Sequence, residues 1–171
     1  MVEDKSPLPE VIIYTDGACI GNPGPGGYGV ILKFDAHIKE LSGGFRLTTN
    51  NRMEIMAAVV ALGVLKKKCA VTIYSDSQLL VDSVEQGWAN KWRKKGWKKG
   101  RKWVLNADLW EQLLGLAEEH DVEFVWVRGH TGIIENERAD QLSMAAAQGM
   151  YLAVDKPYES DETQIKPASL F

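Results

Sequence analysis

Two stretches decide the fold, VIIYTDGAC at residues 11–19 and AVTIYSDSQ at residues 70–78. Each begins with a short apolar run that is typical of a buried strand and leads to a single carboxylate, Asp16 in the first and Asp76 in the second. Acids at the ends of strands in an open α/β sheet can converge on one cleft edge, where such sheets carry their chemistry.

Two further acids lie on helical patterns. Glu54 closes the phrase NNRME at residues 50–54, and Asp140 closes NERAD at residues 136–140. Four carboxylates that converge on one site cannot all remain ionised unless a cation neutralises them. The ions that suit a site made only of oxygen ligands are Mg²⁺ and Mn²⁺.

The rest of the chain predicts a mixed sheet with helices on both faces. Strands at residues 28–34 and 38–45 would join the first strand in an antiparallel meander, and the glycine-rich residues 21–27 are interpreted as a turn. The remaining predicted elements are a helix to about residue 68 capped by Thr48 or Thr49, helices at 78–86 (capped by Ser77), 88–95, 108–120 and 135–148, and a strand at 122–127.

Composition indicates one globular domain. The 171 residues are 45% hydrophobic and 25% charged, and no segment reads as a signal peptide or a membrane span. Cys19 and Cys69 lack C-x-x-C spacing, which favours reduced thiols and a cytoplasmic location. We expect a domain at residues 1–149, with a short N-terminal extension at 1–9, and a flexible tail at 150–171.

Positive charge is concentrated in one segment. Residues 91–102 contain eight basic residues and no acid, although the chain as a whole has a net charge of −3. Trp88, Trp92 and Trp97 alternate with these cations. A basic patch with interleaved aromatic side chains indicates a surface for nucleic acid.

Taken together, the phrases resemble a type 1 ribonuclease H of the bacterial kind over about residues 11–149. The motifs that carry the resemblance are TDGAC, GNPGPGGYG, TTNNRME, SDSQ, GHTG and NERAD. It implies the ribonuclease H-like fold, a five-stranded mixed sheet with three antiparallel and then two parallel strands, in which the first and fourth strands are neighbours. It also implies hydrolysis of the RNA strand of RNA–DNA hybrids.

The acidic set suits that reaction. Two Mg²⁺ ions about 4 Å apart would activate water on one side of the phosphodiester and stabilise the leaving 3′ oxygen on the other. Asp16 is the expected bridging ligand, Glu54 and Asp76 would complete one ion's site, and Asp140 would complete the other's. The products would carry 5′-phosphate and 3′-hydroxyl ends, and Mn²⁺ is expected to be able to substitute for Mg²⁺.

The resemblance also assigns the remaining site residues. It implies that His130, in the GHTG phrase, assists proton transfer or product release. The residues expected at the RNA strand are Gly17, Cys19, Asn22, Asn50 and Gln78. Those expected at the DNA strand are Thr49, Asn106, Trp88, Trp92, Lys94, Lys95, Trp97 and Lys98. An arginine that the family often has two residues before this threonine is Leu47 here, with Arg46 beside it.

Two rival functions remain open at this stage. A transposase, integrase or junction nuclease shares the sheet and the acids, and a hybrid-binding module would share the basic surface without catalysis. We expect a monomer. The C-terminal Ser169, Leu170 and Phe171 resemble, in part, peptides that insert into the bacterial sliding clamp.

Overall fold

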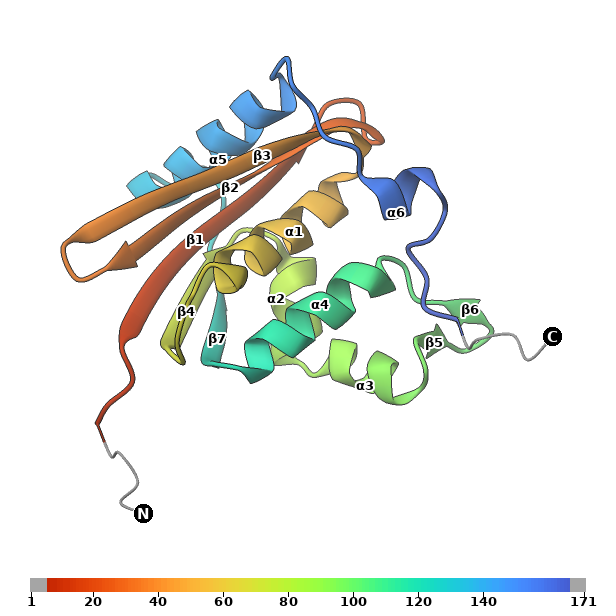
Figure 1. Cartoon of the computed structure of the whole chain (residues 1–171), viewed down its shortest axis with the longest axis horizontal. Helices are drawn as coiled ribbons and strands as arrows, with labels where there is room; N and C mark the ends of the chain where they lie inside the picture. Colours follow the sequence, from red (N-terminus) through yellow and green to blue (C-terminus); the bar gives the residue numbers. More distant parts are fainter. Residues whose placement is uncertain (1–5, 167–171) are drawn as a thin grey trace.

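The computed structural model describes residues 6–166, which form one five-stranded sheet with helices on both faces (Figure 1). The strand order is β3-β2-β1-β4-β7, and a separate two-stranded ladder joins β5 and β6. The strands are β1 Glu10–Cys19, β2 Gly24–Phe34, β3 His37–Thr48, β4 Ala70–Ser75, β5 Lys98–Lys99, β6 Lys102–Trp103 and β7 Asp121–Trp126. The helices are α1 Asn50–Gly63, α2 Gln78–Glu85, α3 Trp88–Lys94, α4 Ala107–Glu118, α5 Ile134–Ala147 and α6 Lys156–Glu159.

The sheet is mixed, as the sequence predicts. β1 pairs antiparallel with β2, and β2 pairs antiparallel with β3. On its other side β1 pairs parallel with β4, which pairs parallel with β7. The expected fold, with the first and fourth long strands as neighbours, is therefore confirmed.

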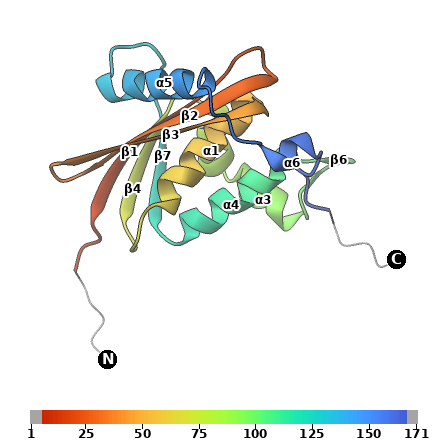
Figure 2. The ribbon, with the colours of Figure 1, turned by 45° about the horizontal axis from the view of Figure 1, so that its top comes forward.

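The two faces of the sheet carry different helices. Figures 1 and 2 show α5 across β1, β2 and β3 on one face, with α1, α3 and α4 on the other. The main core lies between the sheet and α1 and α4, where Ile13 and Ile73 of the sheet meet Leu62 and Leu113 of these helices. Burial of such large apolar side chains is the main source of folding free energy.

The glycine-rich stretch is not the simple turn that was predicted. β2 begins at Gly24, so much of the stretch is strand. A Cβ at Gly27, inside this stretch, would lie 2.5 Å from the Ser143 carbonyl oxygen of α5, and one at Gly29, just after it, would lie 2.2 Å from the Ala139 carbonyl oxygen. These glycines therefore serve close packing of a helix on the sheet, a requirement that local turn propensity does not reveal.

The helix starts agree with the sequence more closely than the helix ends. Of the two candidate caps of α1, Thr49 is the one used, since its hydroxyl accepts from the Arg52 N–H at 3.2 Å. Ser77 caps α2 as predicted. α1 stops at Gly63 instead of continuing into residues 66–68, because glycine and a run of adjacent like charges both disfavour helix.

The segment after α5 differs from the flexible tail that was expected over residues 150–171. Ala153 pairs with Phe45, Asp155 is buried, α6 follows, and Ile165 packs against the core. The residues proposed for clamp binding, Ser169, Leu170 and Phe171, lie outside the described part of the chain. Within residues 6–166 no helix is long and apolar enough to cross a membrane.

Candidate active site

Asp16 and Asp76 meet at one edge of the sheet. β1 and β4 run parallel with Thr15 opposite Ser75, so the residues that follow, Asp16 and Asp76, are also neighbours. β1 continues to Cys19 beyond the predicted end at Asp16, and β4 ends at Ser75, directly before Asp76. Strand register alone thus explains why these two carboxylates converge.

Glu54 reaches the same point from α1. A Cβ at Gly17 would lie 2.5 Å from the Glu54 nitrogen and 2.6 Å from the Met53 carbonyl carbon. The missing side chain therefore lets α1 rest directly on β1. Carboxylate oxygens of Asp16, Glu54 and Asp76 all lie within 4.8 Å of one another.

Asp140 comes to the site on α5. Gly29 is the partner of Asp16 across the antiparallel ladder, and Ala139 of α5 lies directly over Gly29. Asp140 follows Ala139 and shares a side-chain hydrogen bond with Asp16. It stands beside the three-acid cluster and is not part of it.

The cluster holds more negative charge than the protein alone can stabilise. Burial, together with the charges of Glu54 and Asp76, raises the pKa of Asp16 to about 10. Burial and the charge of Asp76 raise the pKa of Glu54 to about 8. The pKa of Asp76 is also raised, chiefly by burial, although the hydrogen bond with Asp16 and the charge of His130 oppose this.

These residues fit a divalent cation. Glu54 Oε2 is buried, and no hydrogen-bond partner for it exists among the described residues. An unpaired buried carboxylate oxygen is unfavourable unless a proton or a metal ion satisfies it. Three carboxylates within bonding range of one point supply the hard oxygen ligands that Mg²⁺ and Mn²⁺ prefer.

We expect Gly17→Ala to damage both fold and site. The added methyl group must displace α1, which typically costs about 1–3 kcal/mol of unfolding free energy. A shift of Glu54 by about 1 Å would also reduce turnover by on the order of 100-fold. Urea unfolding and a cleavage assay measure the two effects.

Gly115→Ala is the matched control. Gly115 lies within α4, and no described atom is within 4 Å of a Cβ built there. Alanine should stabilise this helix by about 0.5–1 kcal/mol and leave turnover unchanged. Equal behaviour of the two variants would contradict the close approach at Gly17.

The raised pKa values predict an unusual dependence of stability on pH. Without metal, Asp16 and Glu54 keep their protons up to about pH 10 and 8 in the folded state, whereas unfolded acids lose them near pH 4. The stability that they contribute is complete below about pH 4 and is lost as pH rises toward these folded values. Urea unfolding in EDTA should therefore show a fall between pH 5 and 8.

Mg²⁺ should reduce this fall, because a cation favours the ionised carboxylates. Asp16→Asn should reduce it as well, since one of the titrating groups is gone. Metal-free stability that is flat or rises over the same range would show that the acids do not hold their protons.

His130 lies in the loop after β7. It is exposed and has a positive φ of 57°, a conformation that costs energy for any residue with a side chain. The residue before it, Gly129, lies against Asp76, since a Cβ at Gly129 would be 2.8 Å from Asp76 Oδ2, and the charge of His130 lowers the pKa of Asp76. This agrees with the position that the sequence suggested for it.

The residues expected at an RNA strand surround the acids. Asn22 Oδ1 accepts from the Asn50 N–H at 3.0 Å, so these two neighbours fix each other at the start of α1. Cys19 Sγ donates to the Thr48 carbonyl oxygen, and Gln78 is exposed at the start of α2. Cys19 ends β1, and Asn50 and Gln78 begin α1 and α2, so these residues lie close in the chain to Asp16, Glu54 and Asp76.

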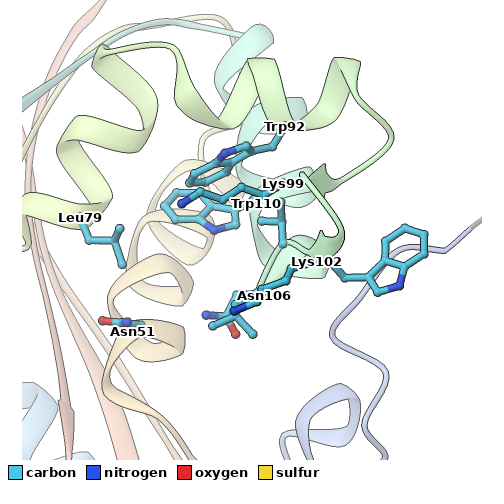
Figure 3. A pocket seen from close by; sticks show the side chains of 10 residues that line it. Asn51, Leu79, Trp92, Lys99, Lys102, Asn106 and Trp110 are labelled. Carbon is cyan, nitrogen blue, oxygen red and sulfur yellow. The ribbon is translucent and has the colours of Figure 1, made fainter.

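A groove of about 450 Å³ lies between the first turns of α1 and α2 and the basic segment (Figure 3). Asn51 of α1 and Leu79 of α2 line one side, and Lys99, Lys102 and Asn106 line the other. Asn51 is one helical turn before Glu54, so the groove begins next to the carboxylates.

The tryptophans of the basic segment divide into two roles. Trp88 is exposed, and Trp92 packs edge-on against Trp110 while one face lines the groove. Trp97 was expected at the DNA strand, but its indole is only 4% exposed and belongs to the core. Trp97 therefore anchors the basic segment to the core, whereas Lys94, Lys95 and Lys98 are exposed and make the surface of the segment positively charged.

Thr49 and Asn106, expected at a DNA phosphate, already have protein partners. Thr49 caps α1, and Asn106 Oδ1 accepts from Arg52 Nη1 at 3.2 Å. Leu47 supplies no cation beside them, and Arg46 is paired with Glu159 of α6. The groove of about 410 Å³ that Thr49 and Asn106 line contains no lysine or arginine.

Several residues at the site escaped the sequence analysis. Trp103 and Leu105 line the groove and were not identified, while Asn51 and Lys102, which also line it, lie in segments that were noted without being assigned to a groove. Trp103 continues the pattern of tryptophan among cations, so the pattern could have been followed further. The sequence around Arg52 gives no indication that its side chain is buried and ion-paired, because its partners lie far along the chain.

Comparison with known families identifies one match, the RNase H family, over residues 9–148. Ribonuclease H of Syntrophus aciditrophicus is 59% identical over 155 residues and covers 90% of this chain and 90% of its own length. Ribonuclease H of Rippkaea orientalis is 58% identical over 152 residues and covers 88% of this chain and 93% of its own length.

Solved structures give the same result. LC9-RNase H1, a type 1 RNase H with the type 2 active-site motif, matches with a TM-score of 0.77 and 32% identity, covering 92% of this chain and 82% of its own. LC11-RNase H1 in complex with RNA/DNA hybrid matches with a TM-score of 0.60 and 27% identity, covering 81% of this chain and 96% of its own.

Proposed function

The chain belongs to the ribonuclease H family, and from this premise we propose that it cleaves the RNA strand of RNA–DNA hybrids by metal-dependent hydrolysis. The observation that carries the proposal is the cluster of Asp16, Glu54 and Asp76, whose carboxylate oxygens lie within 4.8 Å of one another. A groove lined in part by Lys99 and Lys102 is also lined by Asn51, at the start of α1. A relative of the same fold is known in complex with RNA/DNA hybrid.

The four carboxylates would together hold two Mg²⁺ ions. Asp16, Glu54 and Asp76, with Asp140 beside them, would supply the carboxylate ligands. When bound, the ions lower the pKa of the attacking water and neutralise the leaving 3′ oxygen, giving 5′-phosphate and 3′-hydroxyl ends. Mn²⁺ has the same ligand preference and would substitute.

The chain's own residues position the substrate. Asn22, Asn50 and Gln78 present amides that can donate to or accept from a 2′-hydroxyl, the group that distinguishes RNA from DNA. Backbone at Gly17 and Cys19 lies beside them on β1. The basic segment would bind the DNA strand across the minor groove, through Trp88, Trp92, Lys94, Lys95 and Lys98.

We expect His130→Ala to slow turnover by about 10- to 100-fold while the affinity for hybrid changes little. The reason is that the charge of His130 acts on Asp76, and that His130 lies outside the basic segment in the sequence, in a loop whose glycines, Gly129 and Gly132, allow it to move. Single-turnover and steady-state kinetics would separate these steps. Equal losses in turnover and binding would argue against this role.

The test of the function is cleavage of a labelled 20-base-pair RNA–DNA hybrid, with RNA duplex, DNA duplex and junction controls, with and without Mg²⁺. Metal-dependent cutting confined to the RNA strand of the hybrid is the expected result. Cutting of DNA or junctions would favour the transposase-like rival, and binding without cutting would favour a hybrid-binding module. We further propose that the protein acts as a monomer in the cytoplasm.

A further inference from the structure

The C-terminal segment at residues 161–166 reaches the basic hairpin formed by β5 and β6. The Asp108 N–H donates to the Thr163 carbonyl oxygen at 3.1 Å, and Ile165 packs against the core. These contacts fix the segment on both sides of Gln164. Lys166, the next residue, is therefore held beside Trp103 of the hairpin.

Two lysines from separate parts of the chain meet one tryptophan there. In the hairpin Lys98 is directly opposite Trp103, so their side chains share one face. Lys98 Nζ lies 4.7 Å from the centre of the Trp103 ring, and Lys166 Nζ lies 5.8 Å from it. Lys99 and Lys102 belong to the other cross-strand pair and line the groove.

The aromatic ring alone does not account for this arrangement. A cation–π contact at an exposed site contributes about 0.5–1 kcal/mol. Two ammonium groups around one ring repel each other, and none of the ion pairs among the described residues joins Lys98 or Lys166 to an acid. An anion between the two ammonium groups would turn the repulsion into attraction.

The neighbouring groove indicates which anion fits. The groove with Lys99 and Lys102 is also lined by Trp103, the residue whose ring Lys98 and Lys166 both contact, so the two lysines lie next to this groove. The groove beside α6, in contrast, is lined by Asp161 and by no lysine or arginine. Charge therefore favours the hairpin side for a polyanion.

We propose that Lys98, Trp103 and Lys166 form a binding site for one backbone phosphate of the uncut DNA strand. The C-terminal segment thus contributes directly to hybrid binding, and Trp103 holds the two ammonium groups in place. This inference rests on the proposed function, because it assumes that the groove holds a hybrid.

The test compares hybrid binding by the full-length protein and by Lys166→Met in EDTA, where the RNA strand is not cut. Methionine keeps an apolar chain against Trp103 and removes the charge. Loss of one phosphate contact should flatten the slope of log affinity against log salt by about 0.9, and weaken binding about five- to tenfold at 0.1 M salt. Lys98→Met should do the same.

Lys68→Met is the matched control. Lys68 is exposed in the loop after α1, at the opposite end of that helix from Asn51, and should leave the slope unchanged. Melting curves establish that each variant is folded. If Lys166→Met keeps the wild-type slope while the wild-type protein binds hybrid, the site is wrong. If the wild-type protein neither binds nor cuts hybrid, the proposed function itself fails.

A methylphosphonate scan of the DNA strand makes the test specific. Neutralising one particular linkage should weaken binding by the wild-type protein, and Lys166→Met should be insensitive at that linkage alone. Purely additive effects at every linkage would overturn the proposal, because they would show that Lys166 contacts no single phosphate.

Discussion

Asp16→Asn is expected to abolish cleavage of the hybrid, with a loss on the order of 1,000-fold or more. Asp16 is central to the cluster, within reach of Glu54 and Asp76 and hydrogen-bonded with Asp140. An amide of the same shape preserves packing but cannot provide a charged ligand. Cleavage assays over a range of Mg²⁺ concentrations give the measurement.

The same change should stabilise the metal-free protein at neutral pH. It removes a buried acid whose ionisation is opposed by two neighbouring carboxylates. A gain of about 2 kcal/mol would raise the melting temperature by about 4–8 °C. Lower activity together with higher stability would show that the residue is retained for chemistry and not for folding.

Asp121→Asn is the control for both effects. Asp121 is exposed at the start of β7, at the end of the sheet away from the cluster. Its substitution should change neither turnover nor melting temperature appreciably. Metal-dependent turnover that persists in Asp16→Asn would remove the basis of the proposed function.

Arg52→Met should be among the most destabilising single changes in the chain, lowering the unfolding free energy by about 3–5 kcal/mol. Arg52 is completely buried, and its guanidinium donates to both oxygens of Asp155 and both oxygens of Asp108. A fifth bond goes to Asn106 Oδ1, so every N–H of the group has an acceptor.

The damage comes from what remains after the guanidinium is removed. Despite its burial, the hydrogen bonds from Arg52 and Thr48 hold the pKa of Asp155 below its usual value. Without Arg52 this carboxylate is buried and unpaired. Melting temperature should fall by about 6–20 °C in a calorimetric scan.

Arg46→Met provides the comparison. Arg46 makes a similar two-pronged ion pair with Glu159, but its side chain is 60% exposed. Exposed pairs contribute about 0–1 kcal/mol, so this variant should be nearly as stable as the wild type. Equal losses in the two arginine variants would mean that burial does not decide the strength of these pairs.

The sequence predicts the site better than it predicts the surroundings. The meeting of Asp16 and Asp76 follows from two strand ends, and strand patterns are local. The helix caps at Thr49 and Ser77 are local as well. Gly27 was misinterpreted as part of a turn, because its missing side chain admits α5, which lies more than one hundred residues later.

The direction in which each side chain points was the second property that could not be predicted from the sequence. Trp88, Trp92 and Trp97 look equivalent in the sequence, yet only the fold shows that Trp97 points into the core. The segment around Asp155 was predicted to be flexible because residues 150–171 lack a clear periodicity and contain prolines and several acids. It is held by a pairing of charges with Arg52, a partner that composition cannot reveal.

The Arg52 network also constrains the order in which the chain can mature. The two residues of its buried ion pair are 103 positions apart, so synthesis of the sheet, α4 and α5 must be complete before Asp155 exists. Until then two of the five guanidinium hydrogens lack their acceptors. A nascent chain can therefore assemble its sheet early, as domains do during synthesis, but α1 can close over Arg52 without penalty only after Asp155, which follows α5, has left the ribosome.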